Sequence, residues 1–305
     1  MKPQEIICPG LPACWINGWL AAVGATVLDQ RIRLHWTNDG NPKAILSSPK
    51  TDVVDALIES WPSSELLADL PIAEQWKDTD LCKRHVPVDV FVQRASKARM
   101  HPYSWALSST MTDLCVDKNG EVEHAPFDAP GPGTIKWLHH RLVKLQQSKY
   151  INPLETQLHE SLMGYAVRVN NNGLGFDCSR LGSSSDVTPV FIDPIVETLA
   201  FFGLKMFPVR GDGVDQRLDQ HVKTGKRQRG WRSSTSRQGN LRFLWPAWSE
   251  PLDYAAIDAL MDIWNPFPRL KSTWKKLGIH AGWQSVKYNP TASADTTRAF
   301  GSEQL

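Results

Sequence analysis

One segment of the chain combines the side-chain types that bind nucleic acid. Residues 220–249 contain no aspartate and no glutamate, whereas arginine, lysine, glycine, serine and threonine recur throughout. The candidate binding residues are Lys223, Lys226, Arg227, Arg229, Trp231, Arg232, Arg237 and Arg242. Arginine and lysine neutralise phosphates, small polar residues allow close approach to a backbone, and tryptophan stacks on unpaired bases. The segment therefore predicts a flexible nucleic-acid-binding loop.

Other interpretations of this segment stay open from the sequence. A basic loop can be solvated without any ligand, or it can bind an acidic protein partner. His221, near Lys223 and Lys226, is also a candidate general base for an RNA endonuclease that works without metal. Two shorter basic stretches, 94–101 and 136–144, are further candidate contacts, although ordinary solvated helix faces have the same composition.

The sequence contains no recognisable catalytic centre. Neither a G-x-x-x-x-G-K-S/T phosphate loop nor a G-x-S-x-G element is present. His159 and Glu160 begin a zinc-protease pattern, but Met163 stands where the second histidine belongs. The five cysteines include no C-x-x-C pair, which argues against structural zinc and favours reduced thiols. We therefore expect no catalytic residue, no metal and no cofactor.

Length and composition indicate a cytoplasmic protein with a substantial core. The chain has 305 residues, 41% of them hydrophobic and 22% charged, and its formal net charge is only +2. The cations of residues 220–249 are therefore a local concentration. Thirteen tryptophans supply large apolar area for packing or for a subunit interface. The apolar run 11–28 approaches the length of a membrane span, but a buried core helix is the simpler interpretation.

Periodicity and turn residues predict an α+β fold of mixed short strands and helices in two lobes. We expect an N-terminal lobe at 1–118, a Pro/Gly linker at 119–134, a C-terminal lobe at 135–290 and a polar tail at 291–305. Asp193, followed by Pro194, is an expected helix cap. The expected helices are 11–28, 53–61, 135–147, 154–164, 193–203 and 253–263. The expected strands are 31–37, 43–47, 86–92, 167–169, 173–178, 229–233 and 241–244.

Three segments resemble proteins of the CRISPR type I-U (also called I-G) effector operon. The first, LPACWINGWLAAVGATVL, is similar to their opening proline and N-G-W-L-A-A-x-G-x-x-x-L helix. The second, LGFDCSRLGSSSDVTPVFIDPIVETLAFFGLKMFPV, is similar to a polar F-D-x-S-R turn followed by D-P-x-x-E-x-L-A-x-x-G-L-x-x-F-P. The third combines QRGWR with LRFLWPAW in a strand-loop-strand unit. These motifs are structural, so they transfer no catalytic residue.

The resemblance implies a small variant in the large-subunit or accessory-subunit position of a guide-RNA surveillance complex, which serves antiviral defence. Such a subunit contacts guide RNA, target DNA or both, together with other effector subunits, and has no membrane partner. The leading hypothesis is a non-catalytic nucleic-acid-binding subunit. A metal-independent CRISPR RNA-processing endonuclease and a scaffold that binds only protein partners are the alternatives.

Overall fold

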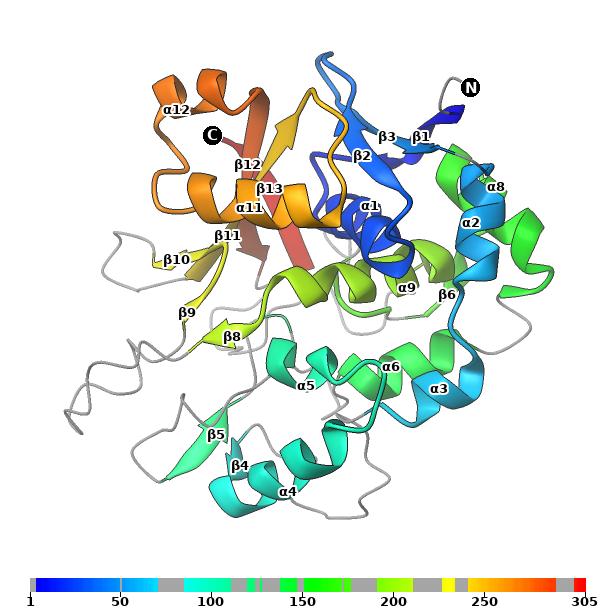
Figure 1. Cartoon of the computed structure of the whole chain (residues 1–305), viewed down its shortest axis with the longest axis vertical. Coiled ribbons are helices and arrows are strands. Elements are labelled where there is room, and N and C mark those ends of the chain that lie inside the picture. Colours follow the sequence, from blue (N-terminus) through cyan, green and yellow to red (C-terminus); the bar gives the residue numbers. More distant parts are fainter. Residues whose placement is uncertain are drawn as a thin grey trace.

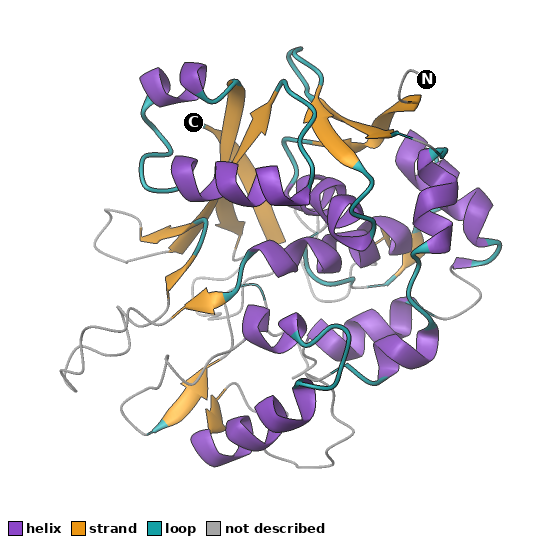
Figure 2. Ribbon diagram, in the orientation of Figure 1, coloured by secondary structure: helices purple, strands orange, loops and turns teal. Residues whose placement is uncertain are grey.

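The structure, a computed structural model, describes residues 4–49, 51–70, 85–110, 120–123, 127, 138–146, 151–171, 173–176, 191–210, 227–233, 241–288 and 299–305. Within these ranges the chain has a mixed α+β fold, which confirms the predicted class (Figure 1, Figure 2). The helices are α1 (Ile16–Leu28), α2 (Val53–Glu59), α3 (Ser64–Ala68), α4 (Val88–Ala98), α5 (Trp105–Thr110), α6 (Leu138–Leu145), α8 (Leu154–Met163), α9 (Pro194–Gly203), α11 (Tyr254–Trp264) and α12 (Lys271–Lys276), with a 3-10 turn, η4 (Leu204–Met206). The strands are β1 (Gln4–Pro12), β2 (Arg33–Trp36), β3 (Lys43–Ser48), β4 (His85–Pro87), β5 (Glu121–Glu123), β6 (Val169–Asn170), β7 (Phe191–Ile192), β8 (Val209–Arg210), β9 (Arg227–Gln228), β10 (Trp231–Ser233), β11 (Leu241–Trp248), β12 (Ile279–Tyr288) and β13 (Ala299–Gln304).

Two antiparallel sheets organise the molecule. The first has the strand order β1-β3-β2, and the second has the order β10-β11-β12-β13. The first sheet is joined to the segment between β11 and α11 by an isolated bridge. Leu34 of β2 and Leu252 each donate a backbone N–H to the carbonyl of the other, at 2.8 and 3.0 Å. Three two-stranded pairs, β4-β5, β6-β7 and β8-β9, complete the described strands.

A central helix pair forms the core. Helix α1 is buried over most of its length and packs against α9 (Figure 1). Gly24 of α1 lies against the backbone of Leu199, and Gly203 of α9 lies against the backbone of Leu20. A side chain at either glycine would meet backbone of the facing helix, so glycine allows this close crossing. The helix is apolar on all sides because every side faces other elements.

Tryptophan side chains connect the N-terminal elements to β11. The indole N–H of Trp19 donates to the carbonyl of Pro246 at 2.8 Å, and that of Trp245 donates to Ala13 at 2.7 Å. Trp248 donates to Leu34 at 2.9 Å. One hydrophobic cluster therefore runs from residue 8 to residue 283, and the predicted division into 1–118 and 135–290 does not separate two cores.

A small satellite cluster lies beside this core. It is formed by Phe91, Ala98, Leu107 and Val122, from α4, α5 and β5 (Figure 1). The predicted strand at 86–92 is wrong, because β4 ends at Pro87 and α4 begins at the next residue. The valines suggested a strand, but burial at Phe91, Arg94 and Ala98 follows a helical period.

Most expected helices are confirmed, and three other expectations need correction. Residues 4–12 form a strand, so the first helix begins at Ile16 rather than at residue 11. The polar tail predicted for 291–305 is wrong at its end, because β13 pairs with β12 over six residues. Residues 173–176 form no strand, and β6 pairs with β7 instead. Most of the predicted linker 119–134 lies outside the described residues.

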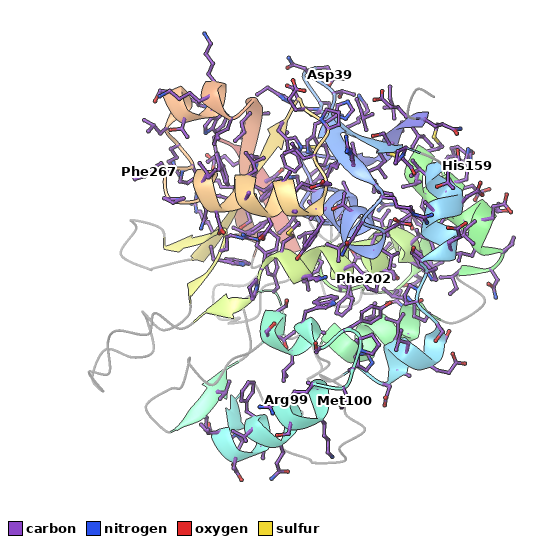
Figure 3. The ribbon with its side chains drawn as sticks, viewed as in Figure 1. Asp39, Arg99, Met100, His159, Phe202 and Phe267 are labelled. Carbon is purple, nitrogen blue, oxygen red and sulfur yellow. The ribbon has the colours of Figure 1, made fainter. Side chains whose placement is uncertain are left out.

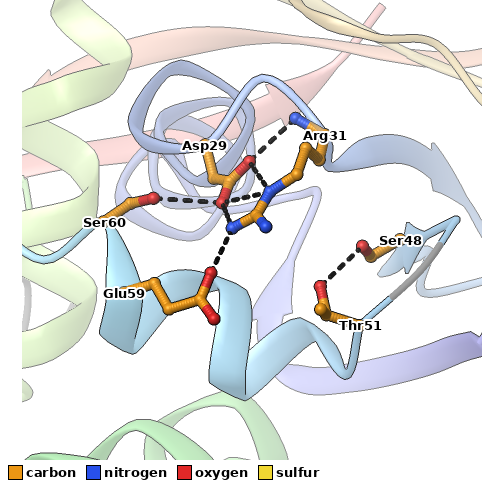
Figure 4. Close-up of polar contacts among 6 residues, drawn as sticks. All are labelled: Asp29, Arg31, Ser48, Thr51, Glu59 and Ser60. Carbon is orange, nitrogen blue, oxygen red and sulfur yellow. Dashed lines mark hydrogen bonds and ion pairs between the residues drawn. The ribbon is translucent and has the colours of Figure 1, made fainter.

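An ionic cluster fixes the end of α1 to α2 (Figure 4). Asp29 caps α1 and accepts hydrogen bonds from Arg31 at 2.6 to 3.1 Å and from the Ser60 hydroxyl at 3.0 Å. Arg31 also pairs with Glu59 at 2.7 Å. Although burial raises the pKa of Asp29, these hydrogen bonds outweigh it and hold the pKa below its usual value. The carboxylate therefore stabilises the folded state in its ionised form.

Candidate nucleic-acid interface

The described part of the basic segment consists of one strand of a two-stranded pair and two antiparallel strands of the second sheet. Its described parts are β9, β10 and β11, while His221, Lys223, Lys226 and Arg237 lie outside the described residues. Gly230, with φ at +86°, makes the turn between β9 and β10 and lies against the ring of Phe243, which leaves no room for a side chain there. The backbone N–H of Gly230 donates to the side chain of Asn265 at 3.0 Å, just beyond α11. The base of the segment is therefore tied to the core.

The strand register places arginine opposite arginine twice in this region. Arg210 of β8 is the partner of Arg227 in β9, and Arg232 of β10 is the partner of Arg242 in β11. Residues directly opposite each other in an antiparallel pair lie about 5 Å apart, and like charges there are unfavourable. The backbone register therefore sets two pairs of arginine positions side by side where the basic segment joins the described strands.

Arg229 does not face a binding surface, which corrects its assignment as a phosphate contact. Its side chain is 3% exposed and forms ion pairs with Asp258 at 2.5 Å and Asp262 at 3.0 Å, both on α11. The guanidinium also donates to the carbonyl of Met206 and lies over the ring of Phe207, 5.8 Å from its centroid. Phosphate has no access to a guanidinium held in this way. Arg229 is an anchor between the β9–β10 turn, α11 and η4.

Trp231 also belongs to the interior, which corrects its assignment as a base-stacking residue. It is 4% exposed, and its ring centroid lies 5.0 Å from that of Phe127 and 5.6 Å from that of Phe243. This aromatic cluster holds β10 against the core, so the face of the indole is not available to a base. The tryptophan stabilises the start of the hairpin.

Arg242 forms one long ion pair on the face of the sheet. It lies 3.4 Å from Glu303 on β13, which also accepts from the amide of Gln284 at 2.8 Å. Gln284 in turn accepts from Arg269 at 2.6 Å. Because Arg242 is 36% exposed and its ion pair is long, it keeps access to solvent. Arg229 and Arg242 thus have acidic partners outside the segment, and Lys223, Lys226, Arg227, Arg232 and Arg237 remain as the candidate phosphate contacts.

The other predicted basic stretches are only partly described. Arg94, on α4, is buried, whereas Arg99 is exposed directly after the helix (Figure 3). Lys144 is exposed on α6, and the preceding side chains of that stretch lie outside the described residues.

Neither a family model, nor a curated protein, nor a solved structure matches this chain. The resemblance to CRISPR type I-U proteins therefore stays a prediction. The structure nevertheless gives a physical reason for its motif glycines. Gly24 and Gly203, from the first and second similar segments, are the two residues at the α1–α9 crossing. In this chain, these two glycines allow close packing of the core and take no part in a reaction site.

One groove contains a histidine and several carboxylates. It has a volume of about 450 Å³, opens between α2 and α8, and is lined by Asp52, Val54, Asp55, Glu155, Thr156, His159, Glu160 and Tyr165. We call it the acidic groove. The Tyr165 hydroxyl and Nδ1 of His159 form a 2.9 Å hydrogen bond, with both side chains exposed (Figure 3). Four carboxylates repel phosphate, so this groove does not suit a nucleic-acid backbone.

Among the described residues, no group of three or more histidine, cysteine, aspartate or glutamate side chains is arranged so that it could hold a metal ion, and this includes the lining of the acidic groove. Cys8 lies in the core, and burial raises the pKa of its thiol to about 12, which keeps it protonated and unreactive. Across the described ranges, no helix has the length and apolarity to cross a membrane.

Sequence reasoning missed one exposed basic surface near the C-terminus. We call it the basic corner, and it consists of Ile263, Phe267, Leu270, Lys271, Lys275 and Lys276 at the junction of α11 and α12. Phe267 points outward at the edge of the molecule (Figure 3). A signal existed, since residues 263–294 contain no aspartate or glutamate. The stretch was overlooked because its lysines are fewer than the cations of residues 220–249.

Proposed function

We propose that this chain is a non-catalytic nucleic-acid-binding subunit of a CRISPR type I-U (I-G) guide-RNA surveillance complex, acting in antiviral defence in the cytoplasm. The observation that carries the nucleic-acid binding is the acid-free, cation-rich composition of residues 220–249, whose strand register also sets the backbone of Arg232 opposite that of Arg242. The assignment to this complex rests on the three segments that resemble its proteins. Its ligands are guide RNA, target DNA or both, and its partners are other effector subunits.

The binding mechanism follows from how the segment is held. Arg229 and Trp231 fix the start of the hairpin inside the core, and β11 continues into the four-stranded sheet. Anchoring these two residues fixes the described base of the segment, which lowers the entropy lost on binding. Five candidate cations remain after Arg229 and Arg242 are assigned to protein carboxylates. Each phosphate contact releases counterions, so binding must weaken steeply with salt.

Binding without turnover is the property that separates this function from its alternatives. The experiment titrates the purified protein into fluorescently labelled repeat-derived RNA and duplex DNA, with a chelator present, and then analyses the RNA on a denaturing gel. The expected result is a salt-sensitive rise in anisotropy with intact RNA.

Two results would contradict the proposal. RNA cleaved in chelator by the wild type but not by His221→Ala would identify a metal-independent endonuclease. An absence of binding to RNA and DNA at moderate salt would favour a scaffold that binds only protein. Arg33→Glu is the matched control, because Arg33 is an exposed cation on β2 and lies outside every basic stretch named as a candidate contact.

A further inference from the structure

Exposed apolar side chains gather in two places on this molecule. Ten large hydrophobic residues are exposed among those described, and six of them belong to two groups. The first group is in the basic corner, and the second includes one residue that lines the acidic groove and two on adjoining segments. The members are Ile263, Phe267 and Leu270 in the first group and Ile7, Tyr165 and Val167 in the second. Contiguous exposed apolar surface rimmed by charge marks an interaction site.

The apolar residues of the basic corner lie close together along the chain. Ile263, in the last turn of α11, precedes Phe267 and Leu270 by four and seven residues. Backbone hydrogen bonds from Phe267 to Trp264 at 3.1 Å and from Leu270 to Phe267 at 3.0 Å continue the turns beyond α11. These three side chains are 58%, 63% and 50% exposed.

Positive charge borders this apolar face. Lys271 is held in place by the C-terminal carbonyl of Leu305 at 3.0 Å, and its ammonium lies 3.4 Å from the centroid of the Trp274 ring. Lys275 and Lys276 are exposed in the last turn of α12. The corner therefore offers a partner three apolar anchors beside fixed cations.

The acidic groove has the complementary character. Asp55 and Glu155 are exposed in the first turns of α2 and α8, and Tyr165 lines the groove between these helices. Val167 follows Tyr165 by two residues, and Ile7 lies on β1, which packs against α8. The groove therefore combines carboxylates with exposed apolar side chains, the counterpart of the basic corner.

The two surfaces lie on opposite sides of the molecule, as the positions of Phe267 and His159 show (Figure 3). We propose that copies of this chain associate head to tail, with the basic corner of one copy seated against the acidic groove of the next. The occupant is a second copy because this chain itself carries both complementary surfaces. Nucleic acid would satisfy the lysines but not Ile263 and Leu270, which cannot stack on bases, and it would leave the acidic groove uncovered. A contact between unlike surfaces leaves one free corner and one free groove on each dimer, so further copies can add until the rotation between copies closes a ring.

The test measures mass by analytical ultracentrifugation on nuclease-treated protein over a concentration series. The average mass of the wild type is expected to rise with concentration and to fall when salt screens the charges. A corner variant carries Phe267→Ser, Lys275→Glu and Lys276→Glu, and a groove variant carries Asp55→Lys and Glu155→Lys. Each variant alone is expected to associate at least tenfold more weakly. All five positions are exposed, so the fold is retained, which thermal unfolding checks.

Mixing the two variants gives the decisive result. The intact corner of the groove variant can meet the intact groove of the corner variant, but neither complex can grow further. The mixture is therefore expected to form a dimer and nothing larger. The control variant, Arg99→Glu with Met100→Ser, changes an exposed charge and an apolar side chain away from both surfaces and should associate like the wild type.

Several outcomes would overturn the proposal. The wild type could remain monomeric at every concentration, the corner or groove variant could associate as the wild type does, or the mixture could fail to dimerise. If the wild type does not self-associate and the corner variant binds anionic vesicles or RNA more weakly than the wild type does, the corner is a binding site for that ligand instead. Because nucleic acid is removed beforehand, failure here is distinct from failure of the proposed nucleic-acid binding.

Discussion

The acidic partners of Arg229 allow its structural role to be tested without changing the arginine. Replacing Asp258 and Asp262 with asparagine leaves a guanidinium that is 3% exposed without any counter-charge at 2.5 and 3.0 Å. Breaking a buried ion pair costs about 3 to 5 kcal/mol. We expect the lower end, about 3 kcal/mol, because both carboxylates are about half exposed and the amide oxygens still accept hydrogen bonds.

The assay compares thermal unfolding and RNA binding for Asp258→Asn/Asp262→Asn. A chain of 305 residues has an unfolding entropy of about 0.6 kcal/mol/K, so about 3 kcal/mol lowers Tm by about 5 °C. The salt slope of RNA binding should not change. Asp39→Asn, which breaks the exposed pair with Lys43 at 3.5 Å, is the control and should cost less than about 1 kcal/mol. The reasoning is refuted if the double variant keeps its Tm and gains a steeper salt slope, because Arg229 would then be a phosphate contact.

Three further predictions concern the core. Gly24→Ala should destabilise the fold by about 2 kcal/mol or more, because the methyl meets the backbone of α9, whereas Gly40→Ala, in open space, should change urea unfolding little. Asp29→Asn should lower the free energy of unfolding at neutral pH. Hydrogen bonds from Arg31 depress the pKa of Asp29, so the stabilisation by the wild-type carboxylate is present above about pH 4 and is lost as pH falls through the folded-state pKa. A difference in stability between wild type and variant that stays constant down to strong acid would contradict this. Cys8 should resist alkylation at neutral pH until the protein unfolds; rapid labelling of the native protein would show that it is not buried.

Elements with local signals could be predicted from the sequence. Asp193 accepts from the backbone N–H groups of Ile195 and Val196 at 2.9 and 3.1 Å, as its place before Pro194 indicates. Strand β13 could not be predicted in this way, because its residues are largely polar and its extended state depends on pairing with β12. The extent of the main core could not be predicted from the sequence either, because indole contacts such as that of Trp19 with Pro246 join residues 227 apart in sequence.

The sequence predicted the composition of the candidate site but not which of its side chains are exposed. The absence of acid in residues 220–249 suggested uncompensated cations, yet Arg229 finds its partners 29 and 33 residues later on α11. Sequence windows count charges along the chain, whereas neutralisation occurs in space. Trp231 shows the same limit, because an indole suits a base and a core equally well and only its contact with Phe127 decides between them.

The salt dependence of nucleic-acid binding tests the central claim most directly. If Lys223, Lys226, Arg227, Arg232 and Arg237 each contact a phosphate, the log–log slope is about −4.5 on duplex DNA and about −3.5 on a single strand. A variant with Lys223→Ala, Lys226→Ala and Arg237→Ala keeps two contacts, and its slope on duplex DNA should fall to about −1.8. Arg229 is excluded from this variant because of its buried ion pairs. An unchanged slope in the folded triple variant would contradict the assignment of nucleic-acid binding to this segment.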